Sequence, residues 1–386
     1  MKVCVPKETT PGERRVALVP DVATKLANAG FEVVMERAAG DAAGYPDSAY
    51  EEAGVTIAGS AEEALGAAGV VTKVQAPAVV DGRDELAAIP RGAALIGFLQ
   101  PLTSPDLVRR LAQAELTSFA MEAIPRTTRA QSMDALSSQA VAAGYRGTLA
   151  AARHLGKFFP MLITAAGTAA PSRVLVLGAG VAGLQAIATA KRLGAVVEAY
   201  DVRPAVKEEV ESLGAKFVQI EVQQEGDGSG EYAKELPEEQ QRRQRELLAK
   251  RVAAADCVIT TAAVPGRPAP KLVTEDMVSE MRPGSVIVDL ASESGGNCDL
   301  TEPGEVVTRH GVTIDGTRNL PSQMPFHASL LYANNVANLL QYISEEGELK
   351  IDLEDEIVAG CCITHGGRIV NERVRELVEG GVKESV

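Results

Sequence analysis

Residues 174–201, VLVLGAGVAGLQAIATAKRLGAVVEAYD, decide the fold of this chain. The four apolar residues 174–177 predict a strand that is buried on both faces. A helical pattern over 181–193 and a second apolar run over 196–200 follow without a proline. This order of strand, glycine loop, helix and strand is typical of a dinucleotide-binding βαβ unit.

The loop carries Gly178, Gly180 and Gly183 in the spacing G-x-G-x-x-G. The first glycine permits a tight turn, the second lets the backbone approach a pyrophosphate, and the third lets the helix pack on the strand. The positive end of the helix points at the loop, which favours a bound phosphate. A glycine-rich turn with a purely structural role is the alternative.

Asp201 ends the second strand, 18 residues after Gly183, where a carboxylate accepts the ribose 2′-hydroxyl of NAD(H). A carboxylate repels a 2′-phosphate, so the position favours NAD(H) over NADP(H). Arg203 follows two residues later. An arginine there serves a 2′-phosphate, braces Asp201 or contacts the adenine, and the sequence leaves these readings open.

Composition limits the class of protein. A chain of 386 residues with 46% hydrophobic residues is long enough for two ordinary domains. The net charge of −14 argues against nucleic acid and anionic membrane surfaces as partners. The five cysteines include no C-x-x-C pair, so we expect free thiols in a reducing cytosol and no metal site. We expect neither a signal peptide nor a membrane span.

Alternating strand and helix signals predict an α/β fold. We expect two Rossmann-like domains with parallel doubly wound sheets, a cleft between them, and two long linking helices over about 132–155 and 325–345. Residues 1–128 and 322–386 form the first, discontinuous domain, which ends in a hairpin over 357–370. Residues 129–321 form the dinucleotide-binding domain, with strand order 3-2-1-4-5-6.

A dense polar cluster precedes the long helix at the expected domain junction. Polar residues at a helix start are expected as caps, which is the structural reading. Arginine also pairs with phosphate, and an amide can hold a carboxamide through two hydrogen bonds. The cluster consists of Arg126, Arg129, Gln131, Asp134, Ser137 and Ser138.

Residues 221–250 interrupt the α/β pattern. Their first half is polar and rich in glycine, and Tyr232 is its one aromatic residue. A loop of this length in a compact domain is usually a functional lid or disordered. We expect a mobile lid over about 221–236, followed by a charged helix.

Several long motifs give the chain a family likeness over its whole length. The motifs are VPKETTPGERRVALVP, PRTTRAQSMDALSSQA, MLITAAGTAAPSRVLVLGAGVAGLQAIATAKRLGA, PGRPAP and DLASESGGNC. With these motifs the chain resembles the NAD(H)-binding component (domain I, alpha subunit) of proton-translocating NAD(P) transhydrogenase, in the superfamily that includes alanine dehydrogenase.

The resemblance implies the site residues. Arg126, Gln131 and Asp134 correspond to the family's group around the nicotinamide and its ribose, and we treat them as the catalytic set. The implied cofactor-binding set is Arg126, Thr127, Thr128, Arg129, Gln131, Asp134, Ser137, Gly178, Gly180, Val181, Gly183, Asp201, Val202, Arg203, Tyr232, Gln244 and Ala263. Tyr232 and Gln244 match the mobile loop, and Ala263 follows the fourth strand.

Alanine dehydrogenase provides the contrast, because oxidation of an amine needs general acid and base groups. Arg15 matches its substrate-binding arginine, although a salt-bridged structural arginine is an equal reading. Its catalytic lysine and histidine correspond to Gln75 and Gln100, and its aspartate to Glu293. Hydride transfer between two nicotinamides moves no proton at the reacting carbons and needs only positioning and exclusion of water. Lys73, two residues from Gln75, leaves a shifted lysine open.

The resemblance therefore implies a Re/Si-specific transhydrogenase component that binds NAD(H), with NADP(H) on a partner component. It also implies a separate proton-conducting membrane component, a homodimer, and a location on the cytoplasmic face of the membrane through the partner chains. This chain is either a separate subunit or a piece of a longer one. An amino-acid dehydrogenase and a non-catalytic NADH-binding subunit are the alternatives.

Overall fold

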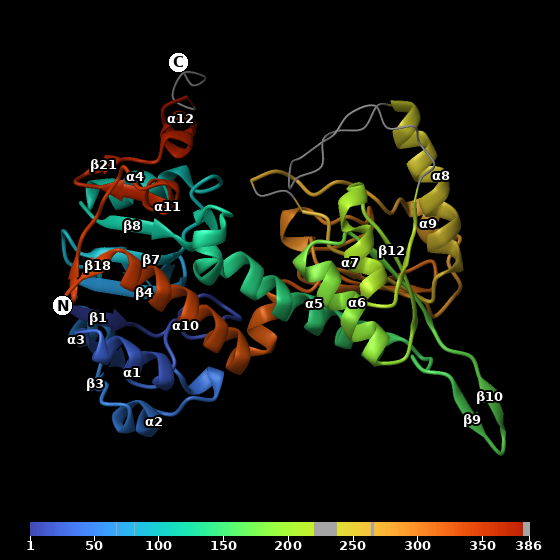
Figure 1. The fold of residues 1–386 in the computed structure, drawn as a ribbon, viewed down its shortest axis with the longest axis horizontal. Coiled ribbons are helices and arrows are strands. Elements are labelled where there is room, and N and C mark those ends of the chain that lie inside the picture. Colours follow the sequence, from blue (N-terminus) through green and yellow to red (C-terminus); the bar gives the residue numbers. More distant parts are fainter. Residues whose placement is uncertain (67, 81, 220–237, 264–265, 381–386) are drawn as a thin grey trace. The chain divides into compact units, whose positions relative to one another are not determined.

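A computed structural model describes residues 1–66, 68–80, 82–219, 238–263 and 266–380. The chain folds into two compact units (Figure 1). Residues 1–139 and 321–386 form the first unit, and residues 140–320 form the second. The boundary therefore lies inside helix α5 (Ala135–His154), so this helix belongs to both units.

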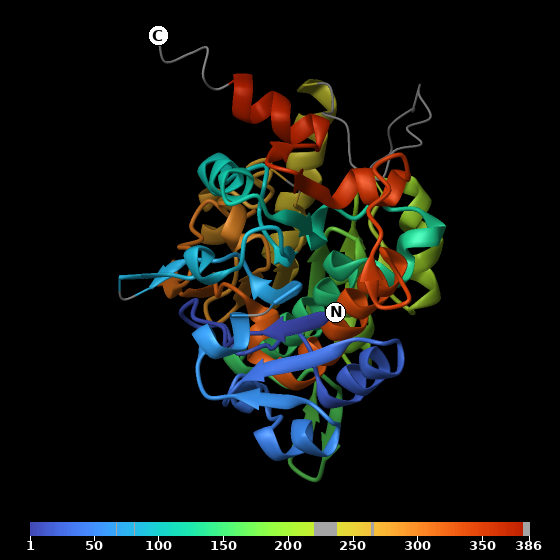
Figure 2. The same ribbon diagram turned by 90° about the vertical axis from the view of Figure 1, so that its left-hand side faces the viewer.

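The first unit is built on an eight-stranded sheet. Figure 2 faces this unit, and Figure 1 shows the red strand β21 and helices α11 and α12 beside the teal elements α4 and β8. Strands β1, β2, β3, β4, β7 and β8 pair in parallel, whereas β20 and β21 are antiparallel. The sheet order is β21 (Arg368–Ile369), β20 (Cys362–His365), β8 (Thr117–Ala120), β7 (Ala94–Phe98), β4 (Val70–Gln75), β1 (Lys2–Val5), β2 (Glu32–Glu36) and β3 (Thr56–Ala58).

Helices cover both faces of this sheet, and two buried apolar clusters fill the space beneath them. The helices are α1 (Pro20–Asn28), α2 (Asp47–Glu52), α3 (Ala61–Leu65), α4 (Pro105–Gln113), α10 (Pro325–Tyr342), α11 (Glu356–Cys361) and α12 (Glu372–Gly380). Two short hairpins complete the unit, β5 (Val79–Val80) with β6 (Arg83–Asp84), and β18 (Ser344–Glu345) with β19 (Glu348–Leu349). Helix α10 lies wholly in the first unit, so the chain returns to that unit before α10 begins.

The second unit is the predicted dinucleotide-binding sheet. Strands one to six follow the predicted order 3-2-1-4-5-6, and an additional strand, β16, lies at the edge. The order is β13 (Lys216–Phe217), β12 (Val196–Tyr200), β11 (Arg173–Leu177), β14 (Cys257–Thr260), β15 (Val286–Asp289), β17 (Val312–Asp315) and β16 (Val306–Arg309). Its helices besides α5 are α6 (Val181–Arg192), α7 (Lys207–Ser212), α8 (Glu238–Ala254) and α9 (Glu275–Ser279).

Strand β11 is buried on both faces, as its apolar run predicts. Val174 and Val176 enter one buried cluster, whereas Leu175 and Leu177 enter the cluster on the opposite face of the sheet. This alternation follows from the two-residue repeat of a strand. A hairpin of β9 (Leu162–Thr164) and β10 (Gly167–Ala169) projects from this unit (Figure 1).

The α/β fold with two mainly parallel sheets is confirmed, and each sheet also has an antiparallel pair at one edge. His310 and Gly311 both have positive φ, 50° and 75°, and form the two-residue turn between β16 and β17. Gly366 and Gly367, with φ of 55° and 75°, form the corresponding turn between β20 and β21. Positive φ at both central residues matches the twist of a tight hairpin.

The predicted hairpin over 357–370 is wrong in its opening residues. Residues 356–361 form helix α11, because the Asp355 carboxylate caps it and accepts hydrogen bonds from the amides of Ile357 and Val358. Only 362–369 form the hairpin. The long helix predicted from residue 132 likewise begins at Ala135, after the 3-10 helix η4 (Thr128–Met133).

All five cysteines are free and buried, as expected. Cys257 and Cys298 lie in the second unit, and Cys4, Cys361 and Cys362 lie in the first. Burial raises the pKa of every one of these thiols. The thiols therefore remain protonated at neutral pH.

The contact between Gly183 and the backbone of Gly178 yields the first test. A Cβ at Gly183 would lie 1.9 Å from the Gly178 carbonyl oxygen, whereas a Cβ at Gly180 meets no atom within 4 Å. Gly183→Ala should therefore push α6 off β11 and lower the free energy of unfolding by about 1–3 kcal/mol or more.

Gly180→Ala is the matched control, since φ at Gly180 is −78° and suits alanine. Urea unfolding followed by circular dichroism measures both variants. Equal stability of the two variants would contradict the assigned role of Gly183.

Candidate functional site

The glycine loop joins the end of β11 to the start of α6. Gly178 has φ of +100°, and its amide donates to the Tyr200 carbonyl at 2.8 Å. Gly180 is the N-cap residue of α6, where no side chain caps the helix. The first amides of a helix lack intrahelical partners, so this 12-residue helix presents donors and a positive dipole end to an anion. The loop and helix start thus have the geometry that we expect of a phosphate cradle, and we call them the cradle below.

A close contact between two helices fixes the direction of α6. A Cβ at Gly144 of α5 would lie 2.1 Å from the carbonyl oxygen of Ala182 in the first turn of α6. The Thr148 hydroxyl lies 3.0 Å from the Gly144 carbonyl oxygen and 3.3 Å from the carbonyl oxygen of Ala186. The backbones of α5 and α6 therefore meet without an intervening side chain beside the cradle.

Asp201 lies at the end of β12, next to the glycine loop. The Ala179 amide donates to its Oδ2 at 2.7 Å, which ties the carboxylate to the loop. Arg203 binds the same carboxylate side-on, with Nε 3.0 Å from Oδ1 and Nη2 2.9 Å from Oδ2. Burial alone would raise the pKa of Asp201, yet the hydrogen bonds from Arg203 and Ala179 lower it. Of the readings left open for Arg203, the structure shows that it braces Asp201.

The turn after β14 completes the loop region. The Thr261 hydroxyl donates to the Gly178 carbonyl at 3.1 Å, so this turn contacts the glycine loop directly. Ala263 is exposed. The Asn297 side chain holds the preceding residue, Ala262, at both its amide, 3.0 Å, and its carbonyl, 2.7 Å. Thr261 and Asn297 were not predicted as site residues, although Asn297 lies in the DLASESGGNC motif.

The fully buried Asp289 carboxylate organises that motif. It accepts hydrogen bonds from the amides of Asn297 and Cys298 and from the hydroxyls of Thr260 and Thr301, at 2.7–3.1 Å. A buried carboxylate is tolerated only when its oxygens are satisfied in this way. Asp289 therefore holds Asn297 in place, and Asn297 holds the turn.

The remaining predicted residues of the second unit differ in how far they are exposed. Val202 and Gln244 are half-buried, and the Gln244 side chain hydrogen-bonds the Tyr200 hydroxyl, whose pKa burial raises to about 12. Val181 is exposed at the start of α6. Tyr232 and the predicted lid over 221–236 lie outside the described residues. The structure thus gathers Gly178, Gly180, Val181, Gly183, Asp201, Val202, Arg203, Gln244 and Ala263 around the carboxyl ends of β11, β12 and β14.

The polar cluster of the first unit forms the entry to α5. Asp134 caps the helix, because its carboxylate accepts from the Ser137 amide at 2.9 Å and the Ser137 hydroxyl at 2.6 Å. The structure therefore confirms, for Asp134, the capping role expected of polar residues at the start of this helix. Gln131 is exposed immediately before this cap, in η4.

Other members of the cluster differ in their surroundings. Arg126 and Thr128 are exposed, and the Thr127 hydroxyl oxygen is buried with no hydrogen-bond partner among the described residues. Arg129 donates to the Tyr342 hydroxyl at 2.6 Å and to the Asp355 carboxylate at 3.0 Å. These contacts fasten η4 to the end of α10 and the cap of α11.

A second polar cluster lies in the core of the first unit, around Arg15. This guanidinium is 4% exposed and pairs with Glu13 through two hydrogen bonds of 2.8 and 2.7 Å. Its Nη1 donates to Gln139 at 2.9 Å, and the Gln75 amide donates to Glu13 at 2.7 Å. Burial alone would raise the pKa of Glu13, but Arg15 lowers it to about 2. Arg15 is thus a salt-bridged residue.

Lys73 is buried in an ion cluster of its own. Its ammonium is 2% exposed and lies 3.0 Å from Glu85 and 3.6 Å from Glu8. Burial raises the pKa of the Glu8 carboxyl. Of the two other positions compared with alanine dehydrogenase, the backbone amide of Gln100 donates to Glu122, and the Glu293 carboxylate accepts from the backbone amide of Asn319 at 2.6 Å. Lys73 is thus held between two carboxylates.

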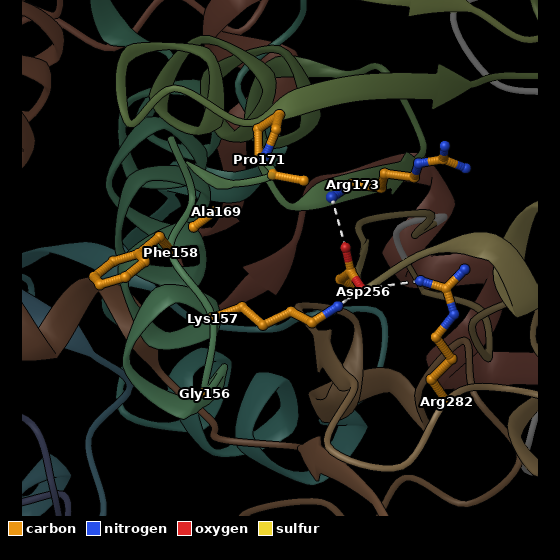
Figure 3. Close-up of a pocket in the computed structure, with 9 residues that line it drawn as sticks. Gly156, Lys157, Phe158, Ala169, Pro171, Arg173, Asp256 and Arg282 are labelled. Atoms are coloured by element: carbon orange, nitrogen blue, oxygen red, sulfur yellow. Dashed lines mark hydrogen bonds and ion pairs between the residues drawn. The ribbon is translucent and has the colours of Figure 1, made fainter. Parts of the chain in front are cut away.

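The second unit has a pocket at the end of its sheet opposite the glycine loop, since Arg173 at the start of β11 lines it. Figure 3 shows this pocket and its lining residues. It opens where β11 and β14 begin. Asp256 lies in it, 2.6 Å from the Lys157 ammonium, 3.6 Å from Arg282 and 3.0 Å from the Arg173 amide. Ligands of doubly wound sheets bind at the carboxyl ends of the strands. This pocket is therefore separate from the glycine loop, and its carboxylate holds the start of β11 through the Arg173 amide.

Comparison with known proteins agrees with this architecture. Residues 4–143 match the family described as alanine dehydrogenase/PNT, N-terminal domain, and residues 147–372 match its C-terminal domain. L-alanine dehydrogenase has a similar structure, with a TM-score of 0.82 and 27% identity over 98% of this chain and 99% of that chain. Two-domain proteins of this class bind a nicotinamide nucleotide.

Relatives of higher sequence identity than alanine dehydrogenase are transhydrogenases. An NAD(P) transhydrogenase alpha-subunit polypeptide of Rhodospirillum rubrum is 51% identical over 376 residues, which cover 96% of this chain and 98% of the relative. The transhydrogenase structure from Sinorhizobium meliloti is 43% identical, with a TM-score of 0.84 over 97% of this chain and 100% of that chain. This chain belongs to the NAD(P) transhydrogenase alpha-subunit family.

The Glu13–Arg15 pair yields a prediction about stability. Arg15→Met leaves a carboxylate with 0% side-chain exposure without its cation, which should lower the free energy of unfolding by about 3–5 kcal/mol at pH 7. The double variant Glu13→Gln/Arg15→Met removes both charges and should recover much of that loss. Urea unfolding measures both variants.

The pH dependence of the same pair has a defined sign. The folded pKa of Glu13 lies below its ordinary value of 4.5, so the pairing stabilises the protein above pH 4.5 and this contribution is lost as the pH falls toward about 2. The stability difference between wild type and Arg15→Met should therefore shrink as the pH falls toward about 2, and the decrease begins above pH 4.5, because burial without Arg15 raises the pKa of Glu13 in the variant. A difference independent of pH would contradict the assignment.

Proposed function

We propose that this chain binds NAD(H) and passes a hydride between NADH and NADP⁺ held on a partner component of a Re/Si-specific, proton-translocating transhydrogenase. NAD(H) is the expected nucleotide because Asp201 stands where the ribose hydroxyl is held and its carboxylate is kept charged. In this proposal the hydride leaves C4 of one nicotinamide and joins C4 of the other, and no proton moves at either carbon.

The proposal depends mainly on which residues stand at the positions where alanine dehydrogenase has its acid, base and substrate-binding groups, and on how these residues are paired. Gln75 and Gln100 are amides, Arg15 is paired with Glu13, and Lys73 is paired with two carboxylates. Oxidation of an amine requires a general base, and the lysine and histidine that alanine dehydrogenase uses are absent from these positions. Hydride transfer between two nicotinamides requires orientation and exclusion of water instead.

The site residues have the following proposed roles. Gly178, Gly180, Val181 and Gly183 hold the pyrophosphate, and Asp201, Val202, Arg203, Gln244 and Ala263 surround the adenosine. Arg126, Thr127, Thr128, Arg129, Gln131, Asp134 and Ser137 hold the nicotinamide and its ribose, with Gln131 orienting the carboxamide. Tyr232 closes over the nucleotide. For Asp134 and Ser137 this function stands beside their role in capping α5.

The proposed partners come from the resemblance and from the relatives' description as an alpha subunit. We propose a separate NADP(H)-binding component, a separate membrane component that conducts protons, and a homodimer of this chain on the cytoplasmic face of the membrane. No helix among the described residues is long and apolar enough to cross a membrane.

A mixing assay tests the function. The chain, a transhydrogenase NADP(H) component, NADPH and an NAD⁺ analogue with shifted absorbance should together reduce the analogue, and omission of either protein should abolish the reaction. The chain alone with NAD⁺ and alanine should produce no NADH. Reduction of NAD⁺ by alanine would replace the proposal with an amino-acid dehydrogenase, and NADH binding without any transfer would indicate a non-catalytic subunit.

Gln131→Asn tests the nicotinamide-orienting role. Shortening the side chain by one methylene should slow hydride transfer by about 10–100-fold, because misplacement of a reacting group by about 1 Å has effects of this size. The affinity for NADH should change little, since the adenosine and pyrophosphate contacts remain. Transfer rates come from the mixing assay and affinities from NADH fluorescence. Equal loss of rate and affinity would mean that Gln131 only helps to bind the nucleotide.

A further inference from the structure

We propose that one face of helix α10 positions Gln131 for hydride transfer. The inference rests on the proposed function, because it assumes that Gln131 orients the nicotinamide. The positioning residues are Asn335, Asn338 and Tyr342. They act on η4, the 3-10 helix that carries Gln131, and not on the nucleotide itself.

Two side-chain amides of α10 hold the backbone next to Gln131. The Nδ2 atoms of Asn335 and Asn338 both donate to the Ser132 carbonyl oxygen, each at 2.9 Å. A carbonyl oxygen has two lone pairs, so these two hydrogen bonds fill its capacity to accept. The carbonyl one residue after Gln131 is therefore held by two donors from one helix.

A third contact holds η4 on the other side of Gln131. Arg129, two residues before it, donates to the Tyr342 hydroxyl at 2.6 Å, and this hydroxyl donates to Asp355 at 2.7 Å. Tyr342 lies four residues after Asn338, on the same face of α10. One helix thus contacts η4 both before and after Gln131.

Apolar packing sets which side of η4 faces outward. Ala130 and Met133 are three residues apart, which places them on the same side of a 3-10 helix, and both enter the core of the first unit. Gln131 and Ser132 lie between them and are exposed. The core thus directs the Gln131 side chain outward, while the α10 contacts fix the backbone from which it extends.

The burial of Asn335 supports a positioning role. This residue is 7% exposed, and its Oδ1 atom is buried with no hydrogen-bond partner in the part of the chain that the structure describes. A buried acceptor without a donor is unfavourable, and an apolar residue at this position would avoid that cost. The hydrogen bond to Ser132 is what asparagine supplies here and an apolar residue does not.

Asn338→Asp in the full chain, measured in the mixing assay, tests the inference. The substitution keeps the shape of the side chain but replaces the donor to Ser132 with an acceptor. Hydride transfer should slow by about tenfold, because Asn335 still holds the carbonyl and the displacement should be smaller than the roughly 1 Å that costs about 100-fold. The affinity for NADH, measured by fluorescence, should change little.

Asn334→Asp is the matched control, since it makes the same change one turn earlier on α10. The Asn334 Nδ2 atom donates to the Leu330 carbonyl of its own helix at 2.8 Å. This variant should therefore transfer hydride at a rate near that of wild type. If Asn334→Asp and Asn338→Asp slowed transfer equally, the added charge would be the cause and the inference would be overturned.

Coupling to Gln131 separates positioning from general destabilisation. In the Gln131→Asn background, Asn338→Asp should have little further effect on transfer, because the group that it positions is already misplaced. Additive losses of rate would overturn the inference. Tyr342→Phe removes the hydroxyl that binds Arg129 and serves if Asn338→Asp does not fold, with the same coupling to Gln131 expected.

The behaviour of wild type distinguishes this inference from the proposed function. Absence of transfer by wild type in the complete mixture would overturn the proposed function and, with it, the role of α10. Transfer by wild type at a rate that neither Asn338→Asp nor Tyr342→Phe changes would overturn the positioning role alone.

Discussion

The direct backbone contact between the first and third glycines of the loop is the constraint on which the second unit depends. The space for a Cβ at Gly183 is already occupied by the Gly178 carbonyl oxygen, so α6 approaches β11 as closely as two backbones allow. Gly144 repeats this close approach between α5 and α6. Together these contacts aim the amides of the first helical turn at one place, where a phosphate is expected to bind.

The two units satisfy their buried charged side chains with different kinds of partner. In the second unit Asp201 and Asp289 are supplied with donors that keep them in fixed positions near the cradle. In the first unit Arg15 and Lys73 are neutralised by Glu13, Glu8 and Glu85. Both cations are therefore compensated by carboxylates within the first unit.

Sequence patterns predicted β11, α6 and β12 within a residue, because each depends on local periodicity and on glycines of known function. They failed where a few polar atoms decide the outcome. The start of the predicted hairpin is helix α11, because Asp355 caps it. Strand β16 was not predicted, because it depends on the tight turn at His310 and Gly311. The clamp of Asn297 on Ala262 joins residues 35 positions apart, and periodicity carries no information about it. The cluster from Arg126 to Ser137 was identified, but its internal contacts, such as Asp134 with Ser137, required coordinates.

The distribution of cysteines has a practical consequence. Every thiol is covered in the folded protein and has a raised pKa, so a thiol-reactive dye reaches it only when the surrounding structure opens. Labelling of Cys257 and Cys298 would report opening of the second unit, and labelling of Cys4, Cys361 and Cys362 would report opening of the first. The reaction rates of these native thiols would therefore measure local opening of each unit separately, without an engineered cysteine.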